Sequence, residues 1–115
     1  MARLVIIYWR DIPSQVVVRR RGETSKRMLS ERFQQAIDRA AMRAGKTGSA
    51  HYLADWRRAA PETVSGDPSL VAQQTADQLE QQFSDDDLLR LIRSHGIAQP
   101  AAGDSRDGGK AGRQR

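Results

Sequence analysis

Two histidines and several serines are the side chains of this 115-residue chain that could do catalytic chemistry. His51 and Asp55 stand four residues apart in a segment of helical pattern, so both could ligate one metal ion. No third ligand lies near them in the sequence. The segment Ala44–Ser49 contains Gly-Lys-Thr but lacks the first glycine and the preceding strand of a phosphate-binding loop. The sequence therefore predicts no catalytic residue, no metal and no cofactor.

A cluster of five cations lies in the segment RRRGETSKR and could bind a phosphate backbone. These cations are Arg19, Arg20, Arg21, Lys26 and Arg27. A two-stranded ribbon fits the major groove, and five phosphate contacts would make binding strongly salt-dependent. No aromatic stacking platform accompanies them. We favour a solvated strand end that pairs with acidic helices of the same chain, and we keep nucleic-acid binding as the alternative function.

The charge distribution supports that preference. The net charge is +5, but residues 1–60 carry 13 basic and 5 acidic side chains, whereas residues 61–96 carry 2 and 7. Part of the basic surface is thus expected to be neutralised within the chain. Total charge overstates the attraction for phosphate.

The stretch YWRDIPSQ, Tyr8 to Gln15, combines residue types that exceed the needs of a strand connection. Loops on a rigid scaffold often carry binding residues, and Trp and Arg are enriched at interface hot spots. We therefore predict that this stretch binds a partner protein. The predicted contact residues are Trp9, Arg10, Asp11, Pro13 and Gln15. The alternative is that the stretch is a fold determinant.

The composition indicates a soluble protein of the cytoplasm. The chain has no cysteine, so disulfides and thiolate chemistry are excluded. The apolar run near the N-terminus is too short for a signal peptide or a membrane span. We expect no membrane partner.

The hydrophobic pattern predicts an N-terminal antiparallel hairpin. Its strands are Arg3–Arg10 and Gln15–Arg21, and we place Pro13 in the connection Asp11–Ser14 because proline has no N–H for a ladder. Two strands alone are marginal in water. A short third strand around Lys26–Leu29, a helical cover or a second copy of the chain must complete the sheet, so a homodimer is compatible with the sequence.

About four helices follow. The first begins at the N-cap Ser30, buries the stripe Phe33, Ala36, Ile37, Ala40 and Ala44, and ends at Gly45. The second covers 49–59, with Tyr52, Leu53 and Trp56 on one side, and 61–69 is a loop. The third begins with Asp67 as N-cap and Pro68 at the first turn, and the fourth with the capping box of Ser84 and Asp87. We predict one α+β domain over residues 1–97 and a disordered basic tail over 98–115.

Three segments carry a resemblance to a known family. The sequences YWRDIP, ERFQQAIDRAAM and YLADWRR resemble the small bacterial proteins and domains grouped as virulence factor domains, mainly over residues 2–60. The resemblance implies a non-enzymatic accessory module, in some members attached to an iron–sulfur-scaffold-like domain. Standalone members are similar to products encoded beside folate- and corrinoid-dependent methyl-transfer enzymes. The family supplies no catalytic residues.

Overall fold

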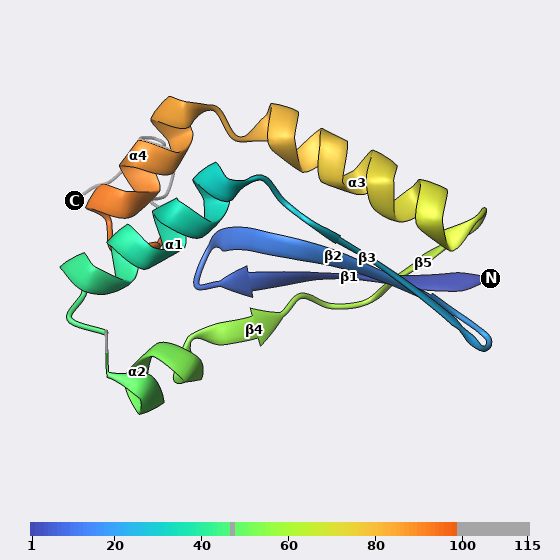
Figure 1. Cartoon of the computed structure of the whole chain (residues 1–115), viewed down its shortest axis with the longest axis horizontal. Coiled ribbons are helices and arrows are strands. Elements are labelled where there is room, and N and C mark those ends of the chain that lie inside the picture. The colour runs from blue at the N-terminus through green and yellow to red at the C-terminus, as the bar shows by residue number, and fades with distance from the viewer. Residues whose placement is uncertain (47, 99–115) are drawn as a thin grey trace, which may run out of the picture.

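The computed structural model describes residues 1–46 and 48–98, which form a five-stranded antiparallel sheet and four helices (Figure 1). The strands are β1 (Ala2–Trp9), β2 (Ile12–Arg20), β3 (Glu23–Met28), β4 (Trp56–Arg58) and β5 (Glu62–Val64). The helices are α1 (Glu31–Arg43), α2 (Ser49–Ala54), α3 (Pro68–Gln82) and α4 (Asp85–Arg93). The predicted α+β class is confirmed.

The sheet is built around β1. On one side β1 pairs with β2, and β2 pairs with β3, which is the predicted third strand in a longer form. On the other side two short strands share the edge of β1: β4 pairs with Ile7–Trp9 and β5 with Ala2–Leu4. The hairpin thus gains the partners that two isolated strands need for stability.

Helices α1 and α3 cover one face of this sheet, and α4 extends this layer beside α1 (Figure 1). α3 lies along β2 and β3, and α1 packs on β2 and against α4. The stripe predicted for α1 is confirmed at four of its residues, while Ala44 is half-buried. The side chains between the layers form one apolar core, whose members include Leu4, Val16, Val18, Phe33, Ile37, Leu79, Leu88 and Ile92.

The turn between β1 and β2 corrects our prediction. We placed it at Asp11–Ser14, but Trp9 pairs with Ile12, so the turn consists of Arg10 and Asp11. Arg10 adopts φ 52°, in the left-handed region that two-residue hairpin turns use. A turn of this kind continues the twist of its strands.

Pro13 accordingly lies inside β2 and is buried. Ile7 pairs with Gln15 and Tyr8 pairs with Pro13, so β2 carries one extra residue, Ser14, at this point. Such an irregularity interrupts the ladder, and a proline is tolerated there because no N–H is required. Pro13 does occupy a position that needs no backbone N–H, as predicted, but this position lies inside β2 and not in the turn.

The predicted second helix is also shorter than expected. α2 ends at Ala54, and Trp56–Arg58 form β4 where we predicted helix. The edge of β1 offers unpaired backbone groups, and pairing them satisfies both segments. The predicted loop over residues 61–69 contains β5 for the same reason.

The helix starts agree with the sequence at two positions and differ at one. The Asp67 carboxylate accepts from the Leu70 N–H at 3.0 Å, and Ser84 and Asp87 form the predicted capping box. The Ser30 side chain makes no cap bond. Instead, the carboxylate of Glu80 in α3 accepts from the Ser30 N–H and hydroxyl.

The predicted tail falls almost entirely outside the described residues, which end at Ala98. The Ala98 N–H donates to the Asp11 carboxylate at 2.6 Å. In the described part of the chain, every helix is too short or too polar to cross a membrane.

Candidate functional site

Trp9 is the first of the predicted contact residues, and its side chain is fully buried. Its indole stacks on Tyr52 with ring centroids 5.9 Å apart, and its Nε1 donates to the Tyr52 carbonyl at 2.9 Å. The ring therefore joins the end of β1 to α2. It offers no surface to a partner of the folded domain.

Arg10 binds two other segments of the same chain. Its Nη1 donates to the His95 carbonyl at 2.9 Å, and its Nε lies 3.3 Å from Asp55 Oδ2. The guanidinium carbon is also 5.2 Å from the centre of the Trp9 ring. The side chain is 16% exposed, and both polar contacts are made within the molecule.

Asp11 also bonds to other segments of the same chain. Its Oδ1 accepts from Arg57 Nη2 at 3.1 Å, its Oδ2 accepts from the Ala98 N–H, and its own N–H donates to the Gly96 carbonyl at 2.8 Å. Arg57 in turn donates through Nε to the Arg10 carbonyl. We call Trp9, Arg10 and Asp11 the hairpin tip. It joins α2, β4 and residues 95–98.

These contacts explain why the segments that carry the family resemblance occur together. YWRDIP supplies the hairpin tip, and YLADWRR supplies its partners Tyr52, Asp55 and Arg57. The geometry favours the fold-determinant alternative for Trp9, Arg10, Asp11 and the buried Pro13. A role of these residues in binding a partner stays a prediction.

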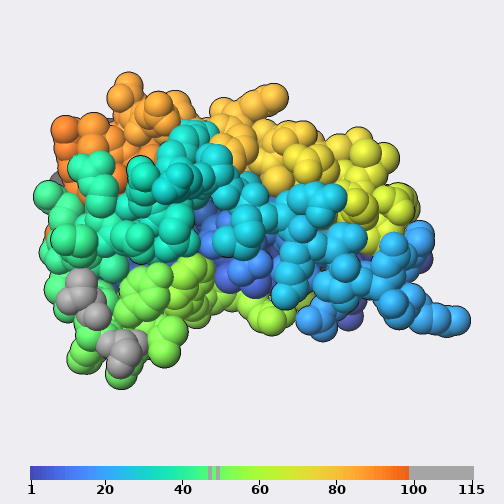
Figure 2. All heavy atoms as spheres, in the orientation of Figure 1, coloured from blue at the N-terminus to red at the C-terminus, as the bar shows by residue number. Residues whose placement is uncertain are grey.

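The segment Arg19–Arg27 does not form one patch. Arg20 pairs with Glu23, and Arg27 donates to Gln73 and Ser69 of α3. Arg21 lies in the turn between β2 and β3, which projects from the right-hand end of the molecule (Figure 2). Arg19 and Lys26 remain, and they lie on the sheet face that points away from α3.

That second face brings cations from four strands together. Residues directly opposite one another in a sheet share a face, and the register pairs Arg3 with Arg19, Val5 with Val17, Val17 with Lys26, and Ile7 with both Gln15 and Arg58. In the described part of the chain, α1 and α3 pack on the opposite face. We call this surface the outer sheet face, formed by Arg3, Val5, Ile7, Gln15, Val17, Arg19, Lys26 and Arg58.

The cations of the outer sheet face have no acidic partner within the described residues. Among residues 1–46 and 48–98, no carboxylate lies within ion-pair distance of Arg3, Arg19, Lys26 or Arg58. All four side chains are exposed. They surround three aliphatic side chains: Val5 and Ile7 are half-buried, and Val17 is buried.

Two hollows lie on this face. The larger, about 530 Å³, is lined by Ile7, Gln15, Trp56, Arg57 and Arg58. The smaller, about 170 Å³, is lined by Arg3, Val5, Val17, Arg19, Arg58 and Pro61. The linings consist of aliphatic and aromatic side chains, arginines, one glutamine and one proline.

Of the predicted contact residues, Gln15 is the one that lies on this face, and of the predicted basic patch, Arg19 and Lys26 do. Sequence reasoning missed Arg3, Arg58 and Trp56. Arg3 could have been found from the register, since a turn at Arg10 and Asp11 places it opposite Arg19. Arg58 carried no such signal, because its strand was predicted as helix.

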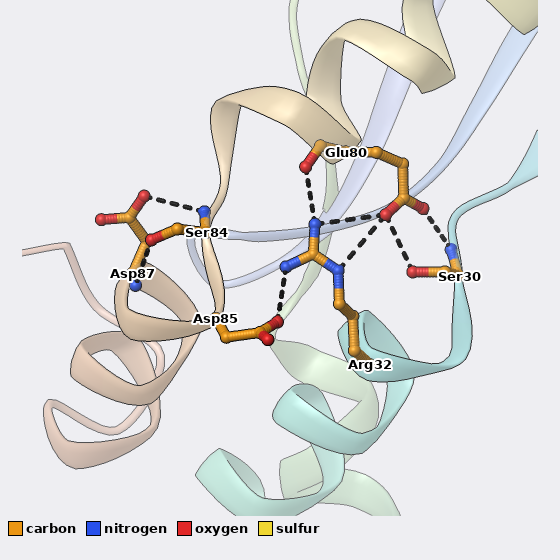
Figure 3. Close-up of polar contacts among 6 residues, drawn as sticks. All are labelled: Ser30, Arg32, Glu80, Ser84, Asp85 and Asp87. Atoms are coloured by element: carbon orange, nitrogen blue, oxygen red, sulfur yellow. Dashed lines mark hydrogen bonds and ion pairs between the residues drawn. The ribbon is translucent and has the colours of Figure 1, made fainter.

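A cluster of charged side chains around Arg32 joins three helices (Figure 3). Arg32 donates to the carboxylate and carbonyl of Glu80 and pairs with Asp85 at 3.0 Å. Partial burial alone would raise the pKa of Glu80, but hydrogen bonds from Ser30 and Arg32 outweigh it and hold that pKa below its usual value. The cluster joins α1, α3 and α4 and contains no groove, so we assign it to stability.

The histidines form no site. The described residues contain no group of three or more His, Cys, Asp or Glu side chains that could hold a metal ion. Asp55, the predicted companion of His51, instead faces Arg10 and Lys46, with its Oδ2 3.3 and 3.8 Å from their nitrogens.

Comparison with known proteins identifies one family. A family model described as "Virulence factor" matches residues 7–92. Searches of curated proteins and of solved structures found no significant match. The matched range includes the hairpin tip, its partners in α2 and β4, and most of the outer sheet face.

Proposed function

The chain belongs to the virulence factor family, and from that premise we propose that it is a non-enzymatic accessory module that binds a partner protein through its outer sheet face. The family description names no reaction. The proposal therefore rests on the geometry of this surface.

The observation that supports it is an apolar row together with cations that have no ion-pair partner among the described residues, on the sheet face opposite α1 and α3. The solvent side of an antiparallel sheet usually carries polar residues. Here Val5, Ile7 and Val17 lie on that side, and four cations surround them. An apolar centre with a polar rim is the usual composition of a protein interface.

A nucleic acid is the second candidate, and the same four cations favour it. Cations bind phosphate groups, but a phosphate backbone would make no favourable contact with the aliphatic row that lies between these cations. The two candidates differ in salt dependence. Nucleic-acid binding through four phosphates should give a slope of roughly −3 to −4 in a plot of log K against log salt concentration, whereas an apolar interface should give a shallower one.

The family resemblance suggests which partners to test first. The resemblance implies a likeness to products encoded beside folate- and corrinoid-dependent methyl-transfer enzymes. We propose enzymes of that class as the first partners for direct binding assays with the purified chain.

The test is an affinity capture with charge-matched variants. The face variant carries Arg3→Gln, Arg19→Gln, Lys26→Gln and Arg58→Gln. The control variant carries Arg21→Gln, Arg39→Gln, Arg43→Gln and Arg93→Gln, four exposed cations elsewhere in the described residues, and so has the same net charge. We expect the face variant to lose at least 90% of the captured partner and the control to retain it. Equal capture by both, or equal loss, would contradict the proposal.

A further inference from the structure

We propose that the segment of the partner that covers the outer sheet face is an acidic amphipathic α-helix. The inference rests on the proposed function and adds the chemistry and shape of the ligand. It follows from the order in which charge and apolar surface alternate across the strands.

Cations lie at both margins of the aliphatic residues, in two adjacent rows of the sheet. Lys26 of β3 lies beside Val17 of β2, Val17 lies beside Val5 of β1, and on the far side Arg58 of β4 lies beside Ile7 of β1. Cations therefore flank the aliphatic row on both sides. The complementary ligand has a narrow apolar stripe with carboxylates on both flanks.

The dimensions suit a helix. Val5 and Ile7 are two residues apart on one strand, about 6.6 Å, and residues i and i+4 of a helix are separated by about 6 Å along its axis. Arg3 extends the row by another two residues, so two to three helical turns would span the basic surface. A helix on this face would complete a second layer opposite α1 and α3.

An added strand fits less well. β1 and β2 are interior strands, so an extended peptide would add at an edge of the sheet, along β3 on one side or along the short strands β4 and β5 on the other. The hollows lie on the face of the sheet. Edge addition would leave the aliphatic row uncovered.

A second copy of the chain fits less well again. A twofold contact through the outer sheet face would bring four unpaired cations against four others. The residues that form the outer sheet face include no acid that could answer them across such an axis, and exposed acids such as Asp38 and Asp86 lie on helices α1 and α4.

The larger hollow provides an anchor point for the helix. Trp56 and Ile7 line it on the apolar side, and Gln15 and Arg58 line it on the polar side. A large apolar side chain from the helix would contact the Trp56 indole. Because Trp9 is fully buried, a change in tryptophan emission on binding is expected to come from Trp56.

The experiment places a photo-cross-linking residue, benzoylphenylalanine, at position 15 of the full chain, in cells that naturally produce the protein. A second chain with the cross-linker at the exposed Gln35 of α1 is the control. Mass spectrometry identifies the cross-linked peptide. We expect a peptide with apolar residues at spacings of three and four and at least three flanking Asp or Glu, which is absent from the control.

The identified peptide, once synthesised, should bind the purified chain, gain helical circular dichroism and change the tryptophan emission. The emission change should vanish in Trp56→Phe. Affinity should fall at least tenfold for the face variant and less than twofold for the control variant defined above.

The outcomes separate this inference from the proposed function. A cross-linked protein segment that is neither acidic nor helical would overturn the helix and leave a protein-binding module. Cross-linking to nucleic acid, to another copy of the chain or to nothing would overturn both.

Discussion

The arginines at the hairpin tip and those on the outer sheet face differ in what they bind. Arg10 of the tip and its β4 partner Arg57 each donate hydrogen bonds to acceptors in other segments of the chain. On the outer sheet face, Arg3, Arg19 and Arg58 have no carboxylate within ion-pair distance among the described residues. The contrast is sharpest at Arg57 and Arg58, which are consecutive in β4. Residue type indicates that an arginine binds an anion, but position in the sheet decides whether that anion belongs to the same chain.

The largest effect should come from Trp9→Ala. The indole is fully buried and joins β1 to α2, so its loss should lower the free energy of unfolding by about 3–5 kcal/mol. In a small domain this could abolish folding, and Trp9→Phe is the milder companion variant. Ile7→Ala, on the outer sheet face, should cost about 1 kcal/mol. Urea denaturation measures all three, and equal costs for Trp9→Ala and Ile7→Ala would erase the distinction between the two regions.

The next largest effect is expected for Gly96→Ala. Gly96 has φ +84°, and an added Cβ would lie 2.9 Å from Cζ3 of Trp9. Strain and overpacking together should cost about 2–4 kcal/mol. Gly22→Ala is the matched control, since Gly22 has φ +72° with nothing within 4 Å of the added Cβ. It should lose about 1–2 kcal/mol from strain alone, and thermal melts of the two variants give the difference.

Arg57 and Arg58 offer a direct comparison between neighbours. Arg57→Gln removes the bonds to Arg10 and Asp11 and the contact of its guanidinium with the Tyr8 ring, 4.5 Å away. We expect a loss of about 1–2 kcal/mol. Arg58→Gln should change stability by less than about 0.5 kcal/mol and should weaken partner binding instead. A larger loss of stability at Arg58 would show that it has a structural role.

The smallest effect concerns pH and the Arg32 cluster. Because the pKa of Glu80 is lower in the folded protein than in the unfolded chain, its contribution is present above the ordinary pKa of 4.5 and is lost as pH falls through the folded value. Glu80→Gln should therefore cost about 1 kcal/mol at pH 7 and progressively less toward pH 3. Urea denaturation at a series of pH values measures this difference. A cost that stayed constant with pH would mean that the carboxylate charge does not matter.

Much of the fold could be predicted because its signals are local. Asp67, Ser84 and Asp87 cap their helices through residues three positions away, and the stripe of α1 follows helical periodicity. The missed features are all long-range. The Ser30 hydroxyl donates a hydrogen bond to Glu80, 50 residues later, and no local sequence pattern predicts such a partner.

The strands show the same limit. β4 and β5 have three residues each, too few for a periodic pattern, and they exist because β1 offers an open edge. The outer sheet face depends on the register of all these strands. Its apolar and basic residues were visible in the sequence, but their grouping required the position of the turn, which Pro13 led us to misplace.

The bonds from Arg10 to His95 and from Asp11 to Ala98 also bear on the order in which the molecule folds. They close loops of 85 and 87 residues, and closing a loop of that length costs roughly 4 kcal/mol of chain entropy before any contact compensates for it. During synthesis the hairpin is made first, but its tip has to wait for almost the whole described chain before His95, Gly96 and Ala98 arrive. Until then the Trp9 ring lacks the Gly96 segment that packs against it. The final step of folding is therefore expected to be the docking of residues 95–98, and a ribosome stalled before that point would present a chain with an incompletely covered tryptophan to chaperones and proteases.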